Sequence, residues 1–232
     1  MKPTSPLVSP QLWKRTMKSN GDPVLILSIR RPSFPESGKC RRIERYFSQL
    51  ARRWQTRWEA DLYPKACQSY TEHQTQSRPF LPWQVKLDYE ITFWQPPLIS
   101  IRLDIQEQGP SSPPCSLCIG EVWDCAAGYP CSLRSFLPET PRLWKRELMK
   151  QLAVLVQQQL DSGESLLRPD CFSDVKQKFD SERFYLTEEG IVVFYPLYAL
   201  GPYGEGIPTF TIPISEPVQS NKLRALSSTA RR

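Results

Sequence analysis

The sequence contains a single histidine, His73, among its 232 residues. A Ser–His or Cys–His catalytic arrangement, or a metal site with histidine ligands, would have to be built on this one side chain. His73 stands beside Glu72 near the end of a predicted helix, a position that favours a solvent-exposed side chain. The shortage of histidine therefore argues against these classes of enzyme.

Long apolar runs are missing as well. No stretch reaches the ~18 consecutive apolar residues that cross a bilayer, and residues 1–35 hold no run like the apolar core of a signal peptide. The run VLILSI at residues 24–29 has the length of a strand. We therefore expect no membrane span, no cleaved export signal and, by default, a cytoplasmic location.

Phosphate-binding fingerprints are absent too. The stretch YALGPYGEGIPTFTIP at 198–213 is rich in glycine, but its spacing is G-x2-G-x-G, no Lys-Ser/Thr follows, and the next residues have a strand pattern. The pattern predicts a loop with positive φ at one or more glycines. No cofactor is expected. We predict that the loop is a binding surface made of Tyr198, Gly201, Pro202, Tyr203, Gly204, Gly206 and Pro208.

What the chain does have is aromatic residues, proline and basic ends. Seven Trp, nine Tyr and ten Phe indicate a sizeable core, and 23 prolines indicate short elements with sharp turns. Residues 1–22 contain four Lys or Arg residues and one Asp. Residues 219–232 contain four Lys or Arg residues and no acidic residue. We predict that residues 1–22 form a disordered arm and that residues 219–232 form a disordered basic tail.

The apolar periodicity predicts helices and strands in separate blocks. Residues 38–74 and 140–163 have helical spacing, whereas residues 83–94 and 98–106 alternate as an antiparallel pair. A strand at 23–32, a hairpin at 183–195 and a last strand after the glycine-rich loop complete the pattern. The predicted fold class is α+β, a mainly antiparallel sheet with two long amphipathic helices packed on one face. A single domain is expected over residues 23–218.

The first predicted helix has a strongly basic face. Its members are Arg41, Arg45, Arg52, Arg53 and Arg57, with Lys39 and Arg42 nearby. A solvated helix face explains this pattern, and so does a contact surface for an acidic partner. Together with the basic ends, this patch gives an alternative function, a cytosolic protein that binds nucleic acid. A steep salt dependence of binding would favour that alternative.

Two further clusters are weak candidates for chemistry. Cys115, Cys118, Cys125 and Cys131 have the spacing C-x2-C-x6-C-x5-C, and only the first half matches a zinc knuckle. A metal site, a redox pair at Cys115 and Cys118, and ordinary cysteines all stay open, and no bound metal is expected. Asp88 and Glu90 share one strand face, with Asp104 on the next strand. These carboxylates give a second alternative, a carbohydrate-active enzyme.

The segment DSERFYLTEEGIVVFYPLYALGPYGEGIPTFTIPISE at 180–216 resembles the C-terminal signature of the RsiV-like domain. This is the lysozyme-sensing outer part of bacterial RsiV-type anti-sigma factors, and it is also attached to PdaC-type deacetylases. The segments ERYFSQLARRWQTRWEADLYPKACQSY, DYEITF, EVWD and LRSFLPE are similar to its helix and central meander, so the resemblance covers roughly residues 24–216. It implies an α+β domain and a binding role, with lysozyme as a possible partner.

Two departures from the family pattern stand in the chain itself. The family has a Gly-Gly-Ala-His-type hairpin loop before its Trp-Asp strand, whereas this chain has EQGPSSPPCSLC. Family members that meet lysozyme also lie outside the membrane, whereas no membrane anchor or export signal is expected in this chain. The leading hypothesis is a non-catalytic binding module that recognises a protein or a cell-wall-derived ligand. Its expected surface combines Tyr198, Tyr203 and residues 201–208 with the hairpin loop at 107–118.

Overall fold

A computed structural model describes residues 8–109, 114–137 and 143–213. The chain divides into two compact units. Unit 1 comprises Met1–Ile91, Arg102–Cys118 and Cys125–Tyr129, and unit 2 comprises Thr92–Ile101, Ile119–Asp124 and Pro130–Arg232. Within the described ranges, no helix is both long enough and apolar enough to cross a membrane.

Unit 1 opens with a β-hairpin. Strand β1 (Ser9–Ser19) pairs antiparallel with β2 (Asp22–Ser33), and Ser19 lies opposite Asp22. The two loop residues, Asn20 at φ 52° and Gly21 at φ 94°, are both left-handed, as a two-residue hairpin turn requires. The prediction of a disordered arm over residues 1–22 was therefore wrong for Ser9–Ser19.

The reason for this error is the position of β1 at the edge of its sheet. Most of its side chains are exposed, and Leu12 is 57% exposed, so the strand shows little apolar alternation. Its order comes from backbone pairing with β2 across the turn. The informative signal was the Asn-Gly pair at the turn, which is a strong short-range indication of a hairpin.

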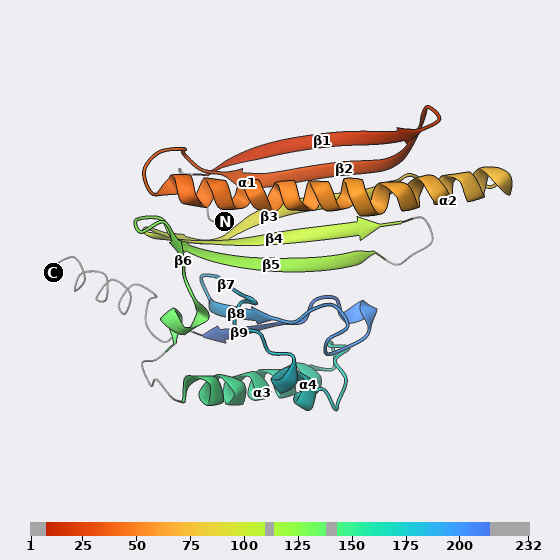
Figure 1. The fold of residues 1–232 in the computed structure, drawn as a ribbon. Helices are drawn as coiled ribbons and strands as arrows, with labels where there is room; N and C mark the ends of the chain where they lie inside the picture. Colours follow the sequence, from red (N-terminus) through yellow and green to blue (C-terminus); the bar gives the residue numbers. More distant parts are fainter. Residues whose placement is uncertain (1–7, 110–113, 138–142, 214–232) are drawn as a thin grey trace. The chain divides into compact units, whose positions relative to one another are not determined.

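A long helical segment follows, composed of α1 (Cys40–Arg57), a π-helical turn (Trp58–Leu62) and α2 (Tyr63–Thr75). Helix α1 runs alongside β2 (Figure 1) and buries Ile43 and Phe47. A proline inside a helix removes one N–H donor and crowds the preceding turn, which usually kinks or interrupts the helix. Here the wider π turn ends two residues before Pro64, and the helical path continues into α2.

Strands β3 (Trp83–Gln95), β4 (Leu98–Gln108), β5 (Cys115–Asp124) and β6 (Tyr129–Pro130) complete the first sheet, in the order β1-β2-β3-β4-β5-β6. The β2–β3 pair is parallel. A parallel pair requires a crossover connection, and the long helix supplies it. Val85, Leu87 and Tyr89 are buried, as their alternation predicted.

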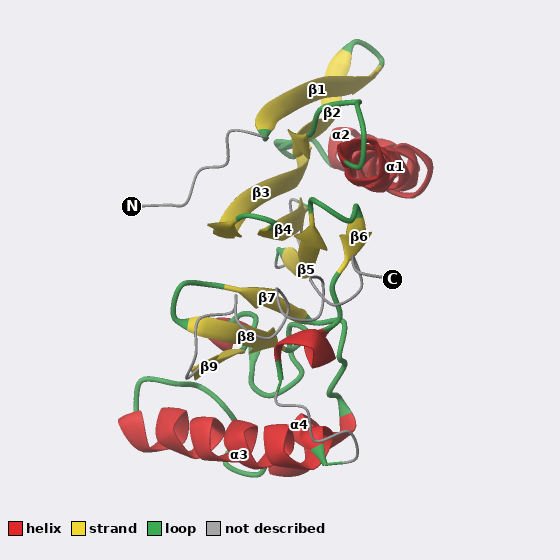
Figure 2. Ribbon diagram, turned by 90° about the vertical axis from the view of Figure 1, so that its left-hand side faces the viewer, coloured by secondary structure: helices red, strands yellow, loops and turns green. Residues whose placement is uncertain are grey.

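Unit 2 contains a small antiparallel sheet of β7 (Phe184–Leu186), β8 (Gly190–Phe194) and β9 (Thr209–Pro213), in that order. Helix α3 (Trp144–Ser162) lies below this sheet in Figures 1 and 2 and contacts β9. The short α4 (Phe172–Gln177) packs on α3, and single 3-10 turns occur at Leu133–Phe136 and Tyr203–Glu205. The core of this unit is apolar and includes Leu148, Leu152, Val156, Val193 and Phe210.

The predicted α+β fold class is confirmed, with a difference in arrangement. The strands fall into two sheets, and each long helix lies against a different one, α1 against β2 and α3 against β9. The single domain expected over residues 23–218 is divided between the two compact units. The tail predicted for residues 219–232 lies outside the described residues.

The β8–β9 pairing leaves no room for a side chain at Gly190. A Cβ at this position would lie 2.1 Å from the carbonyl oxygen of Ile212, and φ is 152°. We expect Gly190→Ala to lower the free energy of unfolding by about 2–3 kcal/mol, because both the backbone conformation and the contact are unfavourable. Urea denaturation followed by circular dichroism measures the loss.

The control is Gly163→Ala at the left-handed end of α3, where φ is 69° and nothing lies within 4 Å of the added Cβ. This variant should lose only about 1 kcal/mol. Equal losses at both glycines would show that the close approach to β9 does not matter.

Candidate functional site

The glycine-rich loop in unit 2 carries two exposed tyrosines, Tyr198 at its start and Tyr203 in its middle. Tyr198 is 52% exposed and Tyr203 is 38% exposed. Their ring centroids are 5.9 Å apart with an angle of 40° between the planes, so the rings touch. Two aromatic rings in contact at the surface form an amphipathic patch, with apolar faces and hydroxyl groups that can exchange hydrogen bonds.

The rest of the predicted loop divides into buried and exposed positions. Gly201 and Pro208 are buried, whereas Pro202 and Gly204 are exposed. A Cβ at Gly201 would lie 2.8 Å from the carbonyl oxygen of Leu166, so this glycine allows a close approach of two backbones. Gly206 has φ 74°, which confirms the prediction of a positive φ in the loop.

Hydrogen bonds hold the loop against the segment that precedes α4. The carboxylate of Glu205 accepts hydrogen bonds from the backbone N–H of Leu166 and from the hydroxyl of Ser165, the second at 3.1 Å. The backbone N–H of Arg168 donates to the carbonyl of Leu200 at 2.9 Å. The tyrosines are thus carried by an anchored loop.

Tyr198 itself has an unusual backbone conformation. Its φ is 65°, in the left-handed region that a tyrosine rarely occupies. The next residue is tied on both sides, because Ala199 N–H donates to the carbonyl of Pro196 at 3.0 Å and the ammonium of Lys178 donates to the Ala199 carbonyl at 2.9 Å. Strain of this kind persists only where the surroundings enforce it, and it is most frequent at functional positions.

A cavity of about 560 Å³ lies next to Tyr198. Its lining consists of residues 177–180, Arg183 and residues 196–199. Sequence reasoning did not include residues 177–183 in the site. Their only signal was a short helix pattern, which does not show that the chain returns to the loop.

The five arginines of the predicted basic patch are all exposed on α1, but they are not equivalent. Arg57 forms an ion pair with Glu107 at 3.2 Å and lies over the ring of Trp54 at 4.8 Å. Within the described part of the chain, the other four have no ion-pair partner; these are Arg41, Arg45, Arg52 and Arg53. The uncompensated charge therefore lies N-terminal to Arg57.

A buried ion pair lies beneath this basic face. Glu44, only 8% exposed, forms an ion pair with Arg31 of β2 at 2.8 Å. It also accepts hydrogen bonds from the backbone N–H of Phe34 at 2.7 Å and from the hydroxyl of Ser48 at 2.8 Å. Burial alone would raise the pKa of the Glu44 carboxyl, but these partners reverse the effect and lower it.

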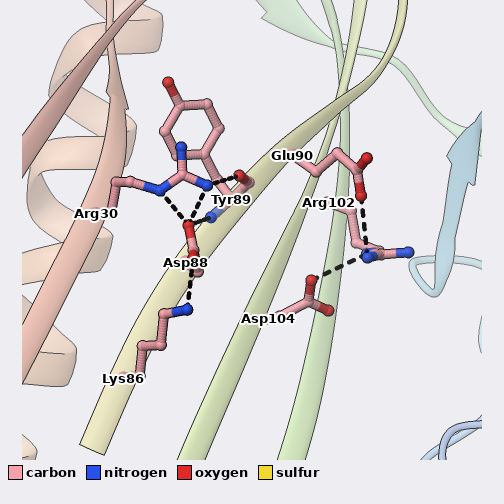
Figure 3. A network of polar contacts seen from close by, with 7 residues as sticks. All are labelled: Arg30, Lys86, Asp88, Tyr89, Glu90, Arg102 and Asp104. Atoms are coloured by element: carbon pink, nitrogen blue, oxygen red, sulfur yellow. Dashed lines mark hydrogen bonds and ion pairs between the residues drawn. The ribbon is translucent and has the colours of Figure 1, made fainter. Parts of the chain in front are cut away.

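The three carboxylates considered for glycan hydrolysis lie in an ion-pair network (Figure 3). Asp88 is held by Arg30 and by Lys86, the second at 2.7 Å. Arg102 forms ion pairs with Glu90 and with Asp104, both at 3.1 Å.

Burial opposes the charge on Asp88, but hydrogen bonds from Lys86, from Arg30 and from the backbone N–H of Tyr89 outweigh it and lower the pKa of this carboxyl. An ionised Asp88 has no proton to donate. It is therefore unsuited to the role of general acid.

The surroundings of the four clustered cysteines do not favour a metal site. Cys115 is exposed, Cys118 is partly buried, and Cys125 and Cys131 are buried. Burial, with a further effect from Asp104, raises the pKa of the Cys118 thiol to about 12, so the thiolate that binds metals is disfavoured. Within residues 8–109, 114–137 and 143–213, no group of three or more His, Cys, Asp or Glu side chains is arranged to hold a metal ion.

His73 lies near the end of α2, where its Nδ1 is 2.7 Å from the carbonyl oxygen of Ser69. Its ring packs edge-on against Phe80, with the ring centroids 5.5 Å apart.

The hairpin loop predicted as a second binding segment spans residues 107–118, and its residues 110–113 lie outside the described part. That prediction stays a prediction.

The Glu44–Arg31 pair gives a prediction for acid stability. Because the folded pKa of Glu44 is lowered, the pair stabilises the fold above the ordinary carboxyl pKa of about 4.5 and loses this effect as the pH falls through the folded value. Glu44→Gln leaves Arg31 buried without a counter-charge and should cost about 3 kcal/mol at pH 7. The difference from the parent chain should shrink towards pH 3, as measured by urea denaturation at each pH.

Glu147→Gln is the matched control, since the ion pairs of Glu147 with Lys150 at 3.0 Å and with Arg146 at 3.5 Å are both exposed. It should change the stability little at any pH. If Glu44→Gln behaves like this control at pH 7, the buried pair does not have the stabilising role assigned to it.

Comparison with known proteins relates a C-terminal segment of the chain to a family without an assigned role. The model of a family described as "Protein of unknown function (DUF3298)" matches residues 137–215. That match contains the whole tyrosine loop and the lining of the adjacent cavity. No curated protein matches the sequence.

Two solved structures share the fold. One is a member of the DUF3298 family (BF2082) from Bacteroides fragilis, with 15% identity, coverage of 89% of each chain and a TM-score of 0.64. The other is a DUF3298 family protein (PA4972) from Pseudomonas aeruginosa, with 16% identity, coverage of 90% of this chain and 91% of that chain, and a TM-score of 0.59. At these identities the likeness concerns the fold. Residues 137–215 of this chain thus match the model of the DUF3298 family, and the chain shares its fold with two solved bacterial structures described as members of that family.

Proposed function

We propose that the chain is a non-catalytic binding module. Its ligand, a protein or a cell-wall-derived molecule, would bind at the tyrosine surface, defined as Tyr198, Tyr203 and the cavity beside them. The observation that carries this proposal is the contact between two exposed tyrosine rings, one of which, Tyr198, lines a cavity of about 560 Å³. Tyrosine is enriched among the residues that dominate binding energy, because it offers a large contact area with few rotatable bonds.

The anchoring of the loop supports recognition as its role. A preorganised surface loses less conformational entropy when it binds, so the same contacts give a higher affinity. Here Glu205 fastens one side of the loop to Leu166, and Lys178 fastens the other side at Ala199. The strained backbone of Tyr198 keeps its side chain outward at a cost to stability.

The state of the ionisable groups supports binding over catalysis. Asp88, Glu90 and Asp104, the residues considered for glycan hydrolysis, are each paired with a cation. Cys118 is held as a thiol by its raised pKa. The carbohydrate-active enzyme considered from the sequence would need an acid and a base or nucleophile within one site.

The resemblance to the RsiV-like domain indicates which ligand to test first. The motif that carries it, residues 180–216, includes Tyr198 and Tyr203 and overlaps the DUF3298 match. The resemblance implies lysozyme as a possible partner, and peptidoglycan fragments represent the cell-wall-derived alternative. Both are soluble and can be titrated directly.

The test is biolayer interferometry of the immobilised full chain against hen lysozyme and against soluble peptidoglycan fragments. We expect binding of one of them at micromolar concentration. The double variant Tyr198→Ala/Tyr203→Ala should weaken it at least thirtyfold, since loss of a central aromatic contact costs about 2 kcal/mol or more.

Tyr129→Ala is the control, because Tyr129 is 56% exposed but lies in unit 1, over Arg42. This variant should bind as the parent chain does. An equal loss in both variants would contradict the assignment of the surface, and the absence of binding to either ligand would overturn the proposal for these two ligands.

A further inference from the structure

Unit 1 contains a second hollow, between the β1–β2 hairpin and α1. Its volume is about 420 Å³, within the range of ~300–1,000 Å³ found for small-molecule sites. We call it the hairpin groove, and its lining residues are Gln11 and Trp13 of β1, Ile29 and Arg31 of β2, and Ser48, Gln49, Ala51, Arg52 and Gln55 of α1.

The strand pairing explains why these residues meet. Trp13 lies opposite Ile29 and Gln11 lies opposite Arg31 in the β1–β2 register. Helix α1 packs against β2 and runs beside the hairpin (Figure 1), so residues of both strands and of the helix line the same hollow. The groove is therefore bounded by a strand pair on one side and by two turns of a helix on the other.

The lining combines an apolar part with many planar polar groups. Trp13, Ile29 and Ala51 supply apolar surface. Three glutamine amides surround it, and each has two N–H donors and one acceptor oxygen. Gln55 donates one of its N–H groups to Glu59 at 3.0 Å, which leaves its other N–H and its oxygen for a ligand. An indole ring beside several amides suits a ligand that has an apolar face and a rim of hydroxyl groups, which describes a sugar ring.

The charge of the groove comes from a single side. Arg31 is neutralised by Glu44 at 2.8 Å. Arg52 is exposed and has no ion-pair partner in the described part of the chain. Arg45 and Arg41 lie seven and eleven residues before Arg52 in the same helix, so the three guanidinium groups follow one stripe of α1. The groove thus favours a ligand that carries carboxylate or another anionic group.

We propose that the hairpin groove binds an acidic saccharide, a short chain of sugar rings that carries carboxylate groups. One ring stacks on Trp13, the amides of Gln11, Gln49 and Gln55 bind its hydroxyl groups, and Arg52 pairs with a carboxylate. Arg45 and Arg41 would meet further anionic units along the helix. This site is separate from the tyrosine surface, and it does not rest on the proposed function.

The same features disfavour nucleic acid, the partner considered for the basic face from the sequence. Proteins that bind single strands offer successive aromatic side chains on which successive bases stack. Trp13 is the one aromatic residue among those that line the groove. Single-stranded DNA is nevertheless the appropriate competitor, because it tests whether any polyanion suffices.

The experiment is isothermal titration calorimetry of the full chain with three probes. The probes are a hyaluronan hexasaccharide, which carries carboxylates, the neutral chitohexaose, and dT12. We expect the hyaluronan fragment to bind at least tenfold more tightly than the other two. Arg52→Ala and Trp13→Ala should each weaken it about tenfold or more, and Arg52→Lys should retain part of the affinity.

Arg53→Ala is the matched control, since Arg53 is the exposed neighbour of Arg52, carries the same charge and does not line the groove. It should leave the affinity nearly unchanged. The Tyr198→Ala/Tyr203→Ala variant should also bind the hyaluronan fragment normally, which separates this site from the tyrosine surface. Thermal unfolding of every variant shows whether it is folded.

Three outcomes would overturn the proposal. The first is no binding of the hyaluronan fragment. The second is an equal loss for Arg52→Ala and Arg53→Ala, which indicates a diffuse electrostatic attraction. The third is tighter binding of dT12 than of the saccharide, which assigns the groove to nucleic acid.

Discussion

The buried pair between Glu44 and Arg31 is the interaction on which unit 1 depends. It joins the first turns of α1 to β2 where both side chains have lost most of their water, so neither charge can be left without the other. Glu44 also accepts a hydrogen bond from the backbone N–H of Phe34. This bond fixes the segment that connects β2 to α1. Because Glu44 neutralises Arg31, Arg52 is the residue that gives the hairpin groove its positive charge. The buried ion pair therefore determines where the positive charge of the groove lies.

In unit 2 the main constraint is different, because two aromatic side chains are held at the surface in contact with water. The tyrosine surface is carried by a loop that would be mobile without Glu205, Gly201 and the contacts at Ala199. Gly201 brings two backbones together, and Glu205 satisfies the donors of the facing segment. The result is a rigid support for exposed rings, at the expense of an unfavourable backbone conformation at Tyr198.

The elements with strong periodicity could be predicted from the sequence. The alternation around Leu87 and the helical spacing from Ile43 to Leu62 identified strand and helix correctly, since burial on one face determines both patterns. Strand β1 could not be found this way, because an edge strand with exposed side chains leaves no apolar signal. The division into two sheets also has no local signal, since it depends on which strands pair.

The candidate site could be predicted from the sequence only in part. The glycine spacing after Tyr198 indicated a loop rather than a phosphate site, and the loop is there. Its neighbours at residues 177–183 come together with it only through the tertiary fold. The charged strand residues show the same limit, because sequence places Asp88 and Asp104 on polar faces but does not reveal the arginines that neutralise them.

The π-helical turn at Trp58–Leu62 has an effect on helical phase. A π turn holds more residues than an α turn, so it shifts the angular position of every later side chain by roughly 100° per added residue. Beyond it, Tyr63 donates to the carbonyl of Lys18 at 2.8 Å, and Tyr70 donates to Asp22. These two hydrogen bonds hold the β1 side and the β2 side of the hairpin turn against the helix. Shortening the π turn by a single residue would rotate both phenol groups away from the hairpin, so the irregularity sets the angular register between the helix and the first two strands.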